Sequence, residues 1–96
     1  MRLDNIELYN FNYIMQNGED MEKRGDSYMN QPYYEEAKRW YLQAANEFKK
    51  AYDYADGYGD TERRDQAYRK QRNAENKRKD AIDALNRQDY GYGAGR

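Results

Sequence analysis

The chain has 96 residues, of which 36% are charged and 38% hydrophobic, and its formal net charge is −1. A chain of this length forms one domain with a thin core. It contains neither cysteine nor histidine, which excludes disulfides, His/Cys metal sites and catalytic triads that need a histidine. No stretch resembles a membrane span, and the N-terminus lacks the pattern of a secretory signal. We therefore expect a cytoplasmic protein that is not an enzyme and uses no cofactor or small-molecule substrate.

The composition predicts an all-α fold. Residues that favour β-strands are scarce, because the only β-branched residues are Ile6, Ile14, Thr61 and Ile82. Twelve tyrosines must supply much of the apolar area that the scarce aliphatic residues cannot. We expect a three-helix bundle built on an antiparallel helical hairpin.

Asp4 is suited to cap a first helix that begins at residue 5. The pair Asn17-Gly18 leaves two alternatives, a short helix that ends there or one helix, continuous or slightly kinked, that reaches Met29. We favour the single helix. On that helix Gly18 and Gly25 share a face with Phe11, so both glycines would let a second helix approach closely.

The second helix is predicted over residues 32 to 56. Pro32 suits its first turn, and Glu35 and Glu36 complement its positive end. A stripe at three- and four-residue steps stops at Asp56-Gly57, and it consists of Tyr34, Ala37, Tyr41, Ala44, Phe48, Ala51, Tyr52 and Ala55.

Asp60 and Thr61 offer caps for a third helix that reaches about Gln88. Its inner face is expected to hold Ala67, Ala74, Ala81, Ile82 and Leu85. The seam is narrow, because polar residues stand where a stronger bundle places leucine: Arg64, Gln71 and Arg78. Residues 89–96 are predicted to form a flexible Gly/Tyr tail, so the helical domain covers residues 1–88.

Residues 25 to 48 resemble one tetratricopeptide unit in the spacing of their small and aromatic residues, which are Gly25, Tyr28, Tyr34, Ala37, Tyr41 and Ala44. The likeness spans Met21 to Lys49, without a second copy and without the closing proline. A lone hairpin followed by one more helix looks more like the microtubule-interacting-and-transport domain. That resemblance implies a module that binds helical peptides in grooves between its helices.

The first helix carries a surplus of apolar side chains. Ile6, Tyr9 and Tyr13 point away from the stripe that holds Phe11 and Ile14, which is typical of a helix that is buried centrally or associates through a second face. Tyr33, Trp40 and Tyr54 flank the stripe of the second helix and are either bundle edge or anchors for a partner. The candidate partner-binding residues are therefore Ile6, Tyr9, Tyr13, Tyr33, Trp40 and Tyr54.

The charged clusters of the chain favour structural roles over binding sites. Glu19, Glu22 and Asp26 share one face of the first helix, and a solvated acidic face is favoured over a cation site. The third helix holds candidate nucleic-acid contacts at Arg69, Lys70, Arg72, Lys77 and Lys79. Acidic residues interleave with them, and the acidic first helix is their natural neighbour, so nucleic-acid binding is the weaker hypothesis.

The sequence thus favours a non-enzymatic helical interaction module that self-associates, as a homodimer, or binds another protein. The alternative is a small stoichiometric inhibitor or accessory protein of phage or mobile-element type.

Overall fold

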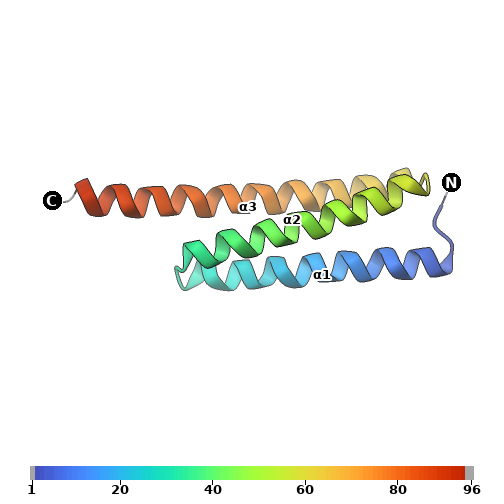
Figure 1. Ribbon diagram of the computed structural model, residues 1–96, viewed down its shortest axis with the longest axis horizontal. Helices are drawn as coiled ribbons and strands as arrows, with labels where there is room; N and C mark the ends of the chain where they lie inside the picture. The colour runs from blue at the N-terminus through green and yellow to red at the C-terminus, as the bar shows by residue number, and fades with distance from the viewer. Residues whose placement is uncertain (1, 95–96) are drawn as a thin grey trace.

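The structure, a computed structural model, describes the backbone of residues 2–94 and the side chains of residues 2–88. Within that backbone there are three helices and no strand: α1 (Asn5–Asn30), α2 (Tyr34–Gly57) and α3 (Thr61–Ala94). The helices lie along a rod of 60 × 18 × 12 Å (Figure 1). The predicted all-α three-helix bundle on an antiparallel hairpin is confirmed.

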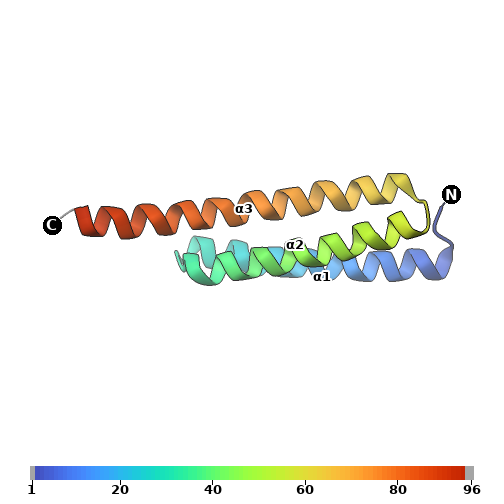
Figure 2. The same ribbon diagram turned by 45° about the horizontal axis from the view of Figure 1, so that its top comes forward.

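The helices are arranged in chain order across the rod. In Figure 1, α2 runs between α1 and α3 and is antiparallel to both. Figures 1 and 2 both show that α3 continues past the loop between α1 and α2. Because α2 separates the backbones of its neighbours, α1 and α3 meet mainly through long side chains that reach across it.

The first helix is continuous through Gly18, as we favoured. Asp4 and Glu7 form a capping box, in which Asp4 Oδ1 accepts from the Glu7 N–H at 2.8 Å and Glu7 Oε1 accepts from the Asp4 N–H at 3.0 Å. Before the cap, Leu3 is buried, and Leu8 packs against the same apolar cluster. Capping and this apolar contact together define where α1 begins.

Two glycines let α1 approach α2, as their shared face predicts. A Cβ at Gly18 would lie 2.6 Å from Cε1 of Phe48, and one at Gly25 would lie 2.5 Å from Cε1 of Tyr41. Both distances are shorter than any real carbon contact, so each ring occupies the space that a side chain would need. The glycines and the two rings fix the register of the hairpin.

The second helix begins two positions later than Pro32. Pro32 lies in the turn, Tyr33 is the N-cap residue, and α2 starts at Tyr34. The prediction of proline in the first helical turn is therefore wrong, because the Tyr33 N–H bonds to the Tyr28 carbonyl at 2.8 Å and keeps this segment in the turn. The far end is at Gly57, and Gly59 then takes a positive φ of 74° that glycine accommodates without strain.

The contact between α2 and α3 is built from alanine. Fully buried alanines recur every seven residues on both helices, at Ala37, Ala44 and Ala51 of α2 and at Ala67, Ala74 and Ala81 of α3. Side chains this small let the helices pack closely. The predicted polar edge is also present, since Arg64, Gln71 and Arg78 are half-buried along α3.

The third helix extends to Ala94, beyond its expected end near Gln88. Glycine lowers helix stability without forbidding the conformation, so Gly91 and Gly93 do not interrupt the backbone. The side chains of residues 89–96 lie outside the described residues, and the flexibility of that tail stays a prediction.

Candidate functional site

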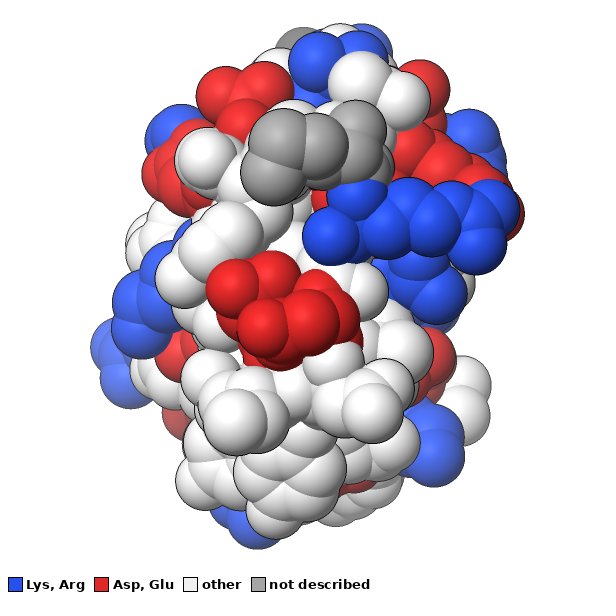
Figure 3. Space-filling view, turned by 90° about the vertical axis from the view of Figure 1, so that its right-hand side faces the viewer, with Lys and Arg blue, Asp and Glu red and all other residues white. Residues whose placement is uncertain are grey.

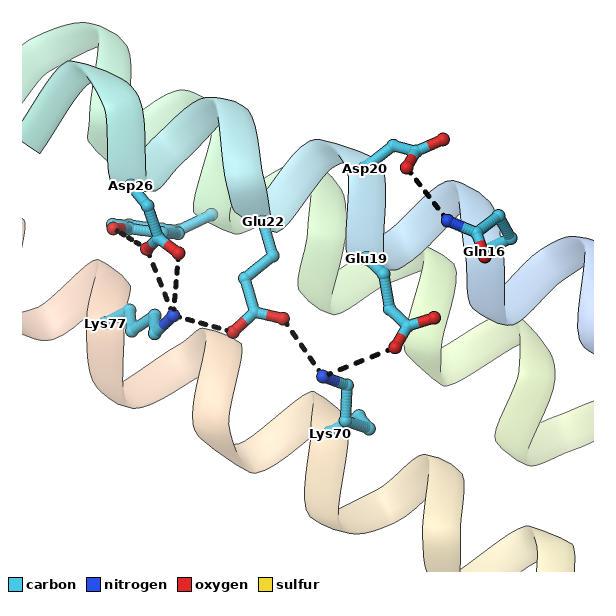
Figure 4. A network of polar contacts seen from close by, with 8 residues as sticks. Gln16, Glu19, Asp20, Glu22, Asp26, Lys70 and Lys77 are labelled. Atoms are coloured by element: carbon cyan, nitrogen blue, oxygen red, sulfur yellow. Dashed lines mark hydrogen bonds and ion pairs between the residues drawn. The ribbon is translucent and has the colours of Figure 1, made fainter.

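Two lysines of α3 cross over α2 to reach carboxylates of α1. Lys70 Nζ lies 3.3 Å from Glu22 Oε1 and 3.8 Å from Glu19 Oε2. Lys77 Nζ lies 2.8 Å from Glu22 Oε2 and 3.0 Å from Asp26 Oδ1. Figure 4 shows the three carboxylates pointing from α1 toward α3, with Glu22 shared between the lysines. We call these five residues the ion ladder.

We call each lysine of the ion ladder, with the carboxylates it contacts, a rung. The Lys77 rung lies beside the phenol of Tyr41. The Tyr41 hydroxyl donates to Asp26 Oδ1 at 2.6 Å, and Lys77 Nζ lies 5.9 Å from the centre of the Tyr41 ring. Burial, together with the hydrogen bond to Asp26, raises the pKa of Tyr41 well above its usual value. Burial opposes the charge on Lys77, but the bonds to Glu22 and Asp26 outweigh it and raise the pKa of the amine.

The Lys70 rung repeats this arrangement seven residues away. Lys70 Nζ lies 5.3 Å from the centre of the Phe48 ring, whose other side occupies the space above Gly18. Each rung therefore stacks a glycine of α1, an aromatic ring of α2 and a lysine of α3. Each ammonium group therefore lies over an aromatic ring and beside carboxylates of α1.

The interpretation of a solvated acidic face is wrong for Glu22, whereas the side chains of Glu19 and Asp26 stay about 40% exposed. Glu22 is only 9% exposed, because the lysines neutralise its charge and allow it to be buried. The expectation that acidic α1 is the neighbour of basic α3 is confirmed by the same ion pairs. Among the described residues, no group of acidic side chains is placed to hold a metal ion.

Asp60 links the segment before α1 to the start of α3. Its carboxylate accepts from the Arg63 N–H at 3.1 Å, as an N-cap of α3, and from the Leu3 N–H at 3.2 Å. The Arg63 guanidinium lies 3.1 Å away. Burial at 1% exposure opposes ionisation, but these three partners outweigh it and hold the pKa of Asp60 below its usual value. The sequence predicted the cap but gave no sign of the bond to Leu3.

The candidate nucleic-acid residues divide into two groups. Lys70 and Lys77 belong to the ion ladder, whereas Arg69, Arg72 and Lys79 are exposed. Phosphate binding at the ladder would have to displace carboxylates from both lysines. This arrangement favours a structural role for the two lysines over a basic stripe for nucleic acid.

The side of α1 that faces away from the bundle carries large apolar groups. Ile6 is 74% exposed, Tyr9 71% and Tyr13 62%. The surrounding positions on this side, all exposed except the half-buried Asn17, carry amides: Asn5, Asn10, Asn12, Gln16 and Asn17. We call these eight residues the outer face of α1.

The outer face of α1 contains no charged side chain, although 36% of the chain is charged. Between residues 5 and 18 the only charge is Glu7, which is used in the capping box. Figure 3, a view onto the end where α1 begins, shows uncharged atoms dominating its lower part and most charged atoms above. Depletion of charge around aromatic side chains is the composition of an interface core.

The candidate residue Tyr54 of α2 borders this surface. The Asn10 amide donates to the Tyr54 hydroxyl at 3.2 Å, and the Tyr54 ring lies 5.1 Å from that of Tyr58. Interaction with Tyr54, and then with Glu7, raises the pKa of Tyr58. Because Asn10 lies between Ile6 and Tyr13 on the helix, Tyr54 extends the outer face of α1 onto α2.

Trp40 lies further along the seam between α1 and α2. It lines a shallow groove of about 350 Å³ with Met21 and Arg24 of α1, and the Arg24 guanidinium lies 4.9 Å from the centre of its ring. Tyr33 is exposed at the loop, 6.3 Å from the Tyr28 ring. The structure therefore brings Ile6, Tyr9, Tyr13 and Tyr54 together. Trp40 lies in a groove that Asn17 of the outer face also lines, whereas Tyr33 lies apart at the loop.

No protein-family model matches this chain, and neither a curated protein nor a solved structure matches it. The likeness to tetratricopeptide and microtubule-interacting-and-transport units stays a resemblance of the sequence. Among the described residues, no helix has the length and apolar character needed to cross a membrane.

Proposed function

We propose that this protein is a helical protein–protein interaction module that binds its partner through the outer face of α1. The observation that supports this is the exposure of Ile6, Tyr9 and Tyr13 on a helix whose opposite side already fills the core. Phe11 and Met15 are buried there, so Ile6, Tyr9 and Tyr13 do not contribute to the core of the bundle. Tyrosine is enriched among the residues that dominate binding energy at interfaces.

The ion ladder supports the same proposal indirectly. It holds α1 against α3 from the side that carries Glu22 and Asp26, so the opposite side of α1 is presented on a helix with a fixed position. A preordered surface loses less conformational entropy on binding than a mobile one.

A photo-crosslinking amino acid at position 9, introduced into the protein in its natural cells, tests the proposal. We expect a covalent adduct with a protein, either a second copy or another chain. The matched control is position 68, an exposed tyrosine of α3 outside the proposed surface. Adducts that form equally at both positions, or at neither, would contradict the proposal.

A further inference from the structure

We infer that the partner of the outer face of α1 is a second copy of this chain, packed antiparallel to the first about a two-fold axis between Tyr9 and Tyr13. The inference rests on the proposed function and names the partner of that site. In a two-fold contact the same patch meets itself, so each residue i that touches j is matched by a j that touches i.

The chemistry of the outer face of α1 suits self-contact. A charged patch repels its own copy, whereas this one carries no charge. Its amides, on Asn5, Asn10, Asn12, Gln16 and Asn17, each donate and accept hydrogen bonds, so an identical surface supplies the complementary groups. A partner of opposite charge finds nothing here to recognise.

The spacing along α1 sets the register. Within α1, Ile6, Tyr13 and Asp20 recur every seven residues, and Tyr9 and Gln16 are also seven residues apart. The two series alternate at three- and four-residue steps, as the two seam positions of a coiled coil do. In an antiparallel pair, residues of one series face residues of the other, which places Tyr9 against Tyr13 of the second copy.

The ends of the contact favour the same register. With Tyr9 against Tyr13, Ile6 faces Gln16 of the other copy, and Asp20 lies beside the end where α1 of the other copy begins, which is the positive end of that helix. In the present structure Asp20 points away from α3 and accepts from the Gln16 amide at 2.9 Å (Figure 4). A parallel pair would instead set Asp20 against Asp20, which are like charges.

The surface is modest for a dimer. Ile6, Tyr9 and Tyr13 expose on the order of 400 Å², about half of the 800 Å² that each partner buries in a standard interface, and the flanking amides with Tyr54 enlarge it. We therefore expect a reversible dimer with a dissociation constant on the order of micromolar.

Light scattering during size-exclusion chromatography, at protein concentrations from about 1 to 300 µM, tests whether the partner is a second copy of the chain. We expect the mass to rise from one chain to two. The double variant Tyr9→Glu/Tyr13→Glu should weaken the dimer about 100-fold or more with unchanged helicity, because each buried charge costs at least about tenfold. Leu42→Glu, at an exposed position of α2 away from this face, is the control and should leave the dimer intact.

Cysteine pairing tests the register, because the chain has no cysteine of its own. Ile6→Cys and Gln16→Cys keep both tyrosines. In the inferred register each cysteine is about 15 Å from its own copy, too far for a disulfide, and close to the other variant. We expect little disulfide in either variant alone and efficient disulfide formation in an equimolar mixture.

Three outcomes would overturn the inference. Self-linking of Ile6→Cys alone would show a parallel pair or an antiparallel pair centred on Ile6, and either result contradicts the inferred register. If the wild type dimerises but the mixture of the two cysteine variants does not cross-link, the dimer uses another face or another register. A monomer at every concentration would exclude the second copy, while an adduct from position 9 with another protein would leave the proposed function standing.

Discussion

The Phe48 ring fills the place of the missing side chain of Gly18, at 2.6 Å from where a Cβ would stand. The same ring is covered on the α3 side by Lys70. Phe48 is therefore fully buried in contact with a glycine of α1 and beneath the ammonium group of a lysine of α3.

Gly18→Ala should destabilise the protein by about 1 to 3 kcal/mol, because the added methyl group overpacks the contact with Phe48. The control is Gly57→Ala, where a Cβ would meet nothing within 4 Å. That change should be neutral or stabilising by about 0.5 kcal/mol, because alanine lowers the entropy of the unfolded chain. Urea unfolding followed by circular dichroism measures both. Equal effects at the two positions would mean that α1 and α2 are not in this close contact.

Lys77→Met should destabilise the bundle by about 1 to 2 kcal/mol. The substitution keeps an apolar side chain of similar length but removes the charge that pairs with Glu22 and Asp26. The expected cost is below that of a fully buried pair because the lysine is partly exposed. Lys79→Met, at an exposed position of α3, is the control and should change stability by less than about 0.5 kcal/mol.

A double-mutant cycle of Lys77→Met and Glu22→Gln isolates the interaction energy between these two side chains from their other contributions to stability. The coupling between positions 22 and 77 should exceed about 0.5 kcal/mol. Additive effects would show that the two side chains do not interact in solution.

Asp60→Ala should destabilise the protein by about 2 kcal/mol, because it removes the cap of α3 and leaves the Leu3 N–H without its acceptor. The pKa of Asp60 is below the ordinary value of 3.8, so its ionised form is favoured in the folded state. That stability is present above pH 4 and is lost as the pH falls through the folded pKa. Stability between pH 5 and pH 2 should therefore fall less steeply in Asp60→Ala than in the wild type, and identical slopes would contradict this.

Alkaline pH should weaken the Lys77 rung. The pKa of Tyr41 is raised above 10.0 and that of Lys77 above 10.5, so the unfolded chain loses both protons first. The stability that these two groups contribute is therefore fully present below about pH 10 and falls as the pH rises through the folded pKa values.

Tyr41→Phe separates the contribution of the phenol to this pH dependence. It should cost about 1 to 2 kcal/mol at pH 7, through loss of the bond to Asp26, and it should reduce the decline above pH 10. Thermal unfolding at pH 8, 10 and 11 measures both effects. Tyr68→Phe, at an exposed tyrosine of α3, is the control.

Much of the fold could be predicted from the sequence, because its signals are local. The Asp4 cap, the stripe from Ala37 to Ala55 and the glycines at positions 57 and 59 each act within a few residues of chain, where propensity and periodicity apply. The surplus apolar side of α1 was also predictable, since Ile6 and Phe11 cannot point into the same core from one helix. The sequence by itself therefore determined three helices and the face that each one buries.

The tertiary structure alone decided which residues from different helices meet. Glu22 has the same sequence character as any exposed glutamate, and it is buried because Lys70 and Lys77 arrive from a segment about fifty residues away. The Leu3 N–H finds Asp60 for the same kind of reason. These contacts depend on the register between helices, which small steric facts such as the ring of Phe48 over Gly18 select, and a helix's own periodicity carries no information about its neighbour's register.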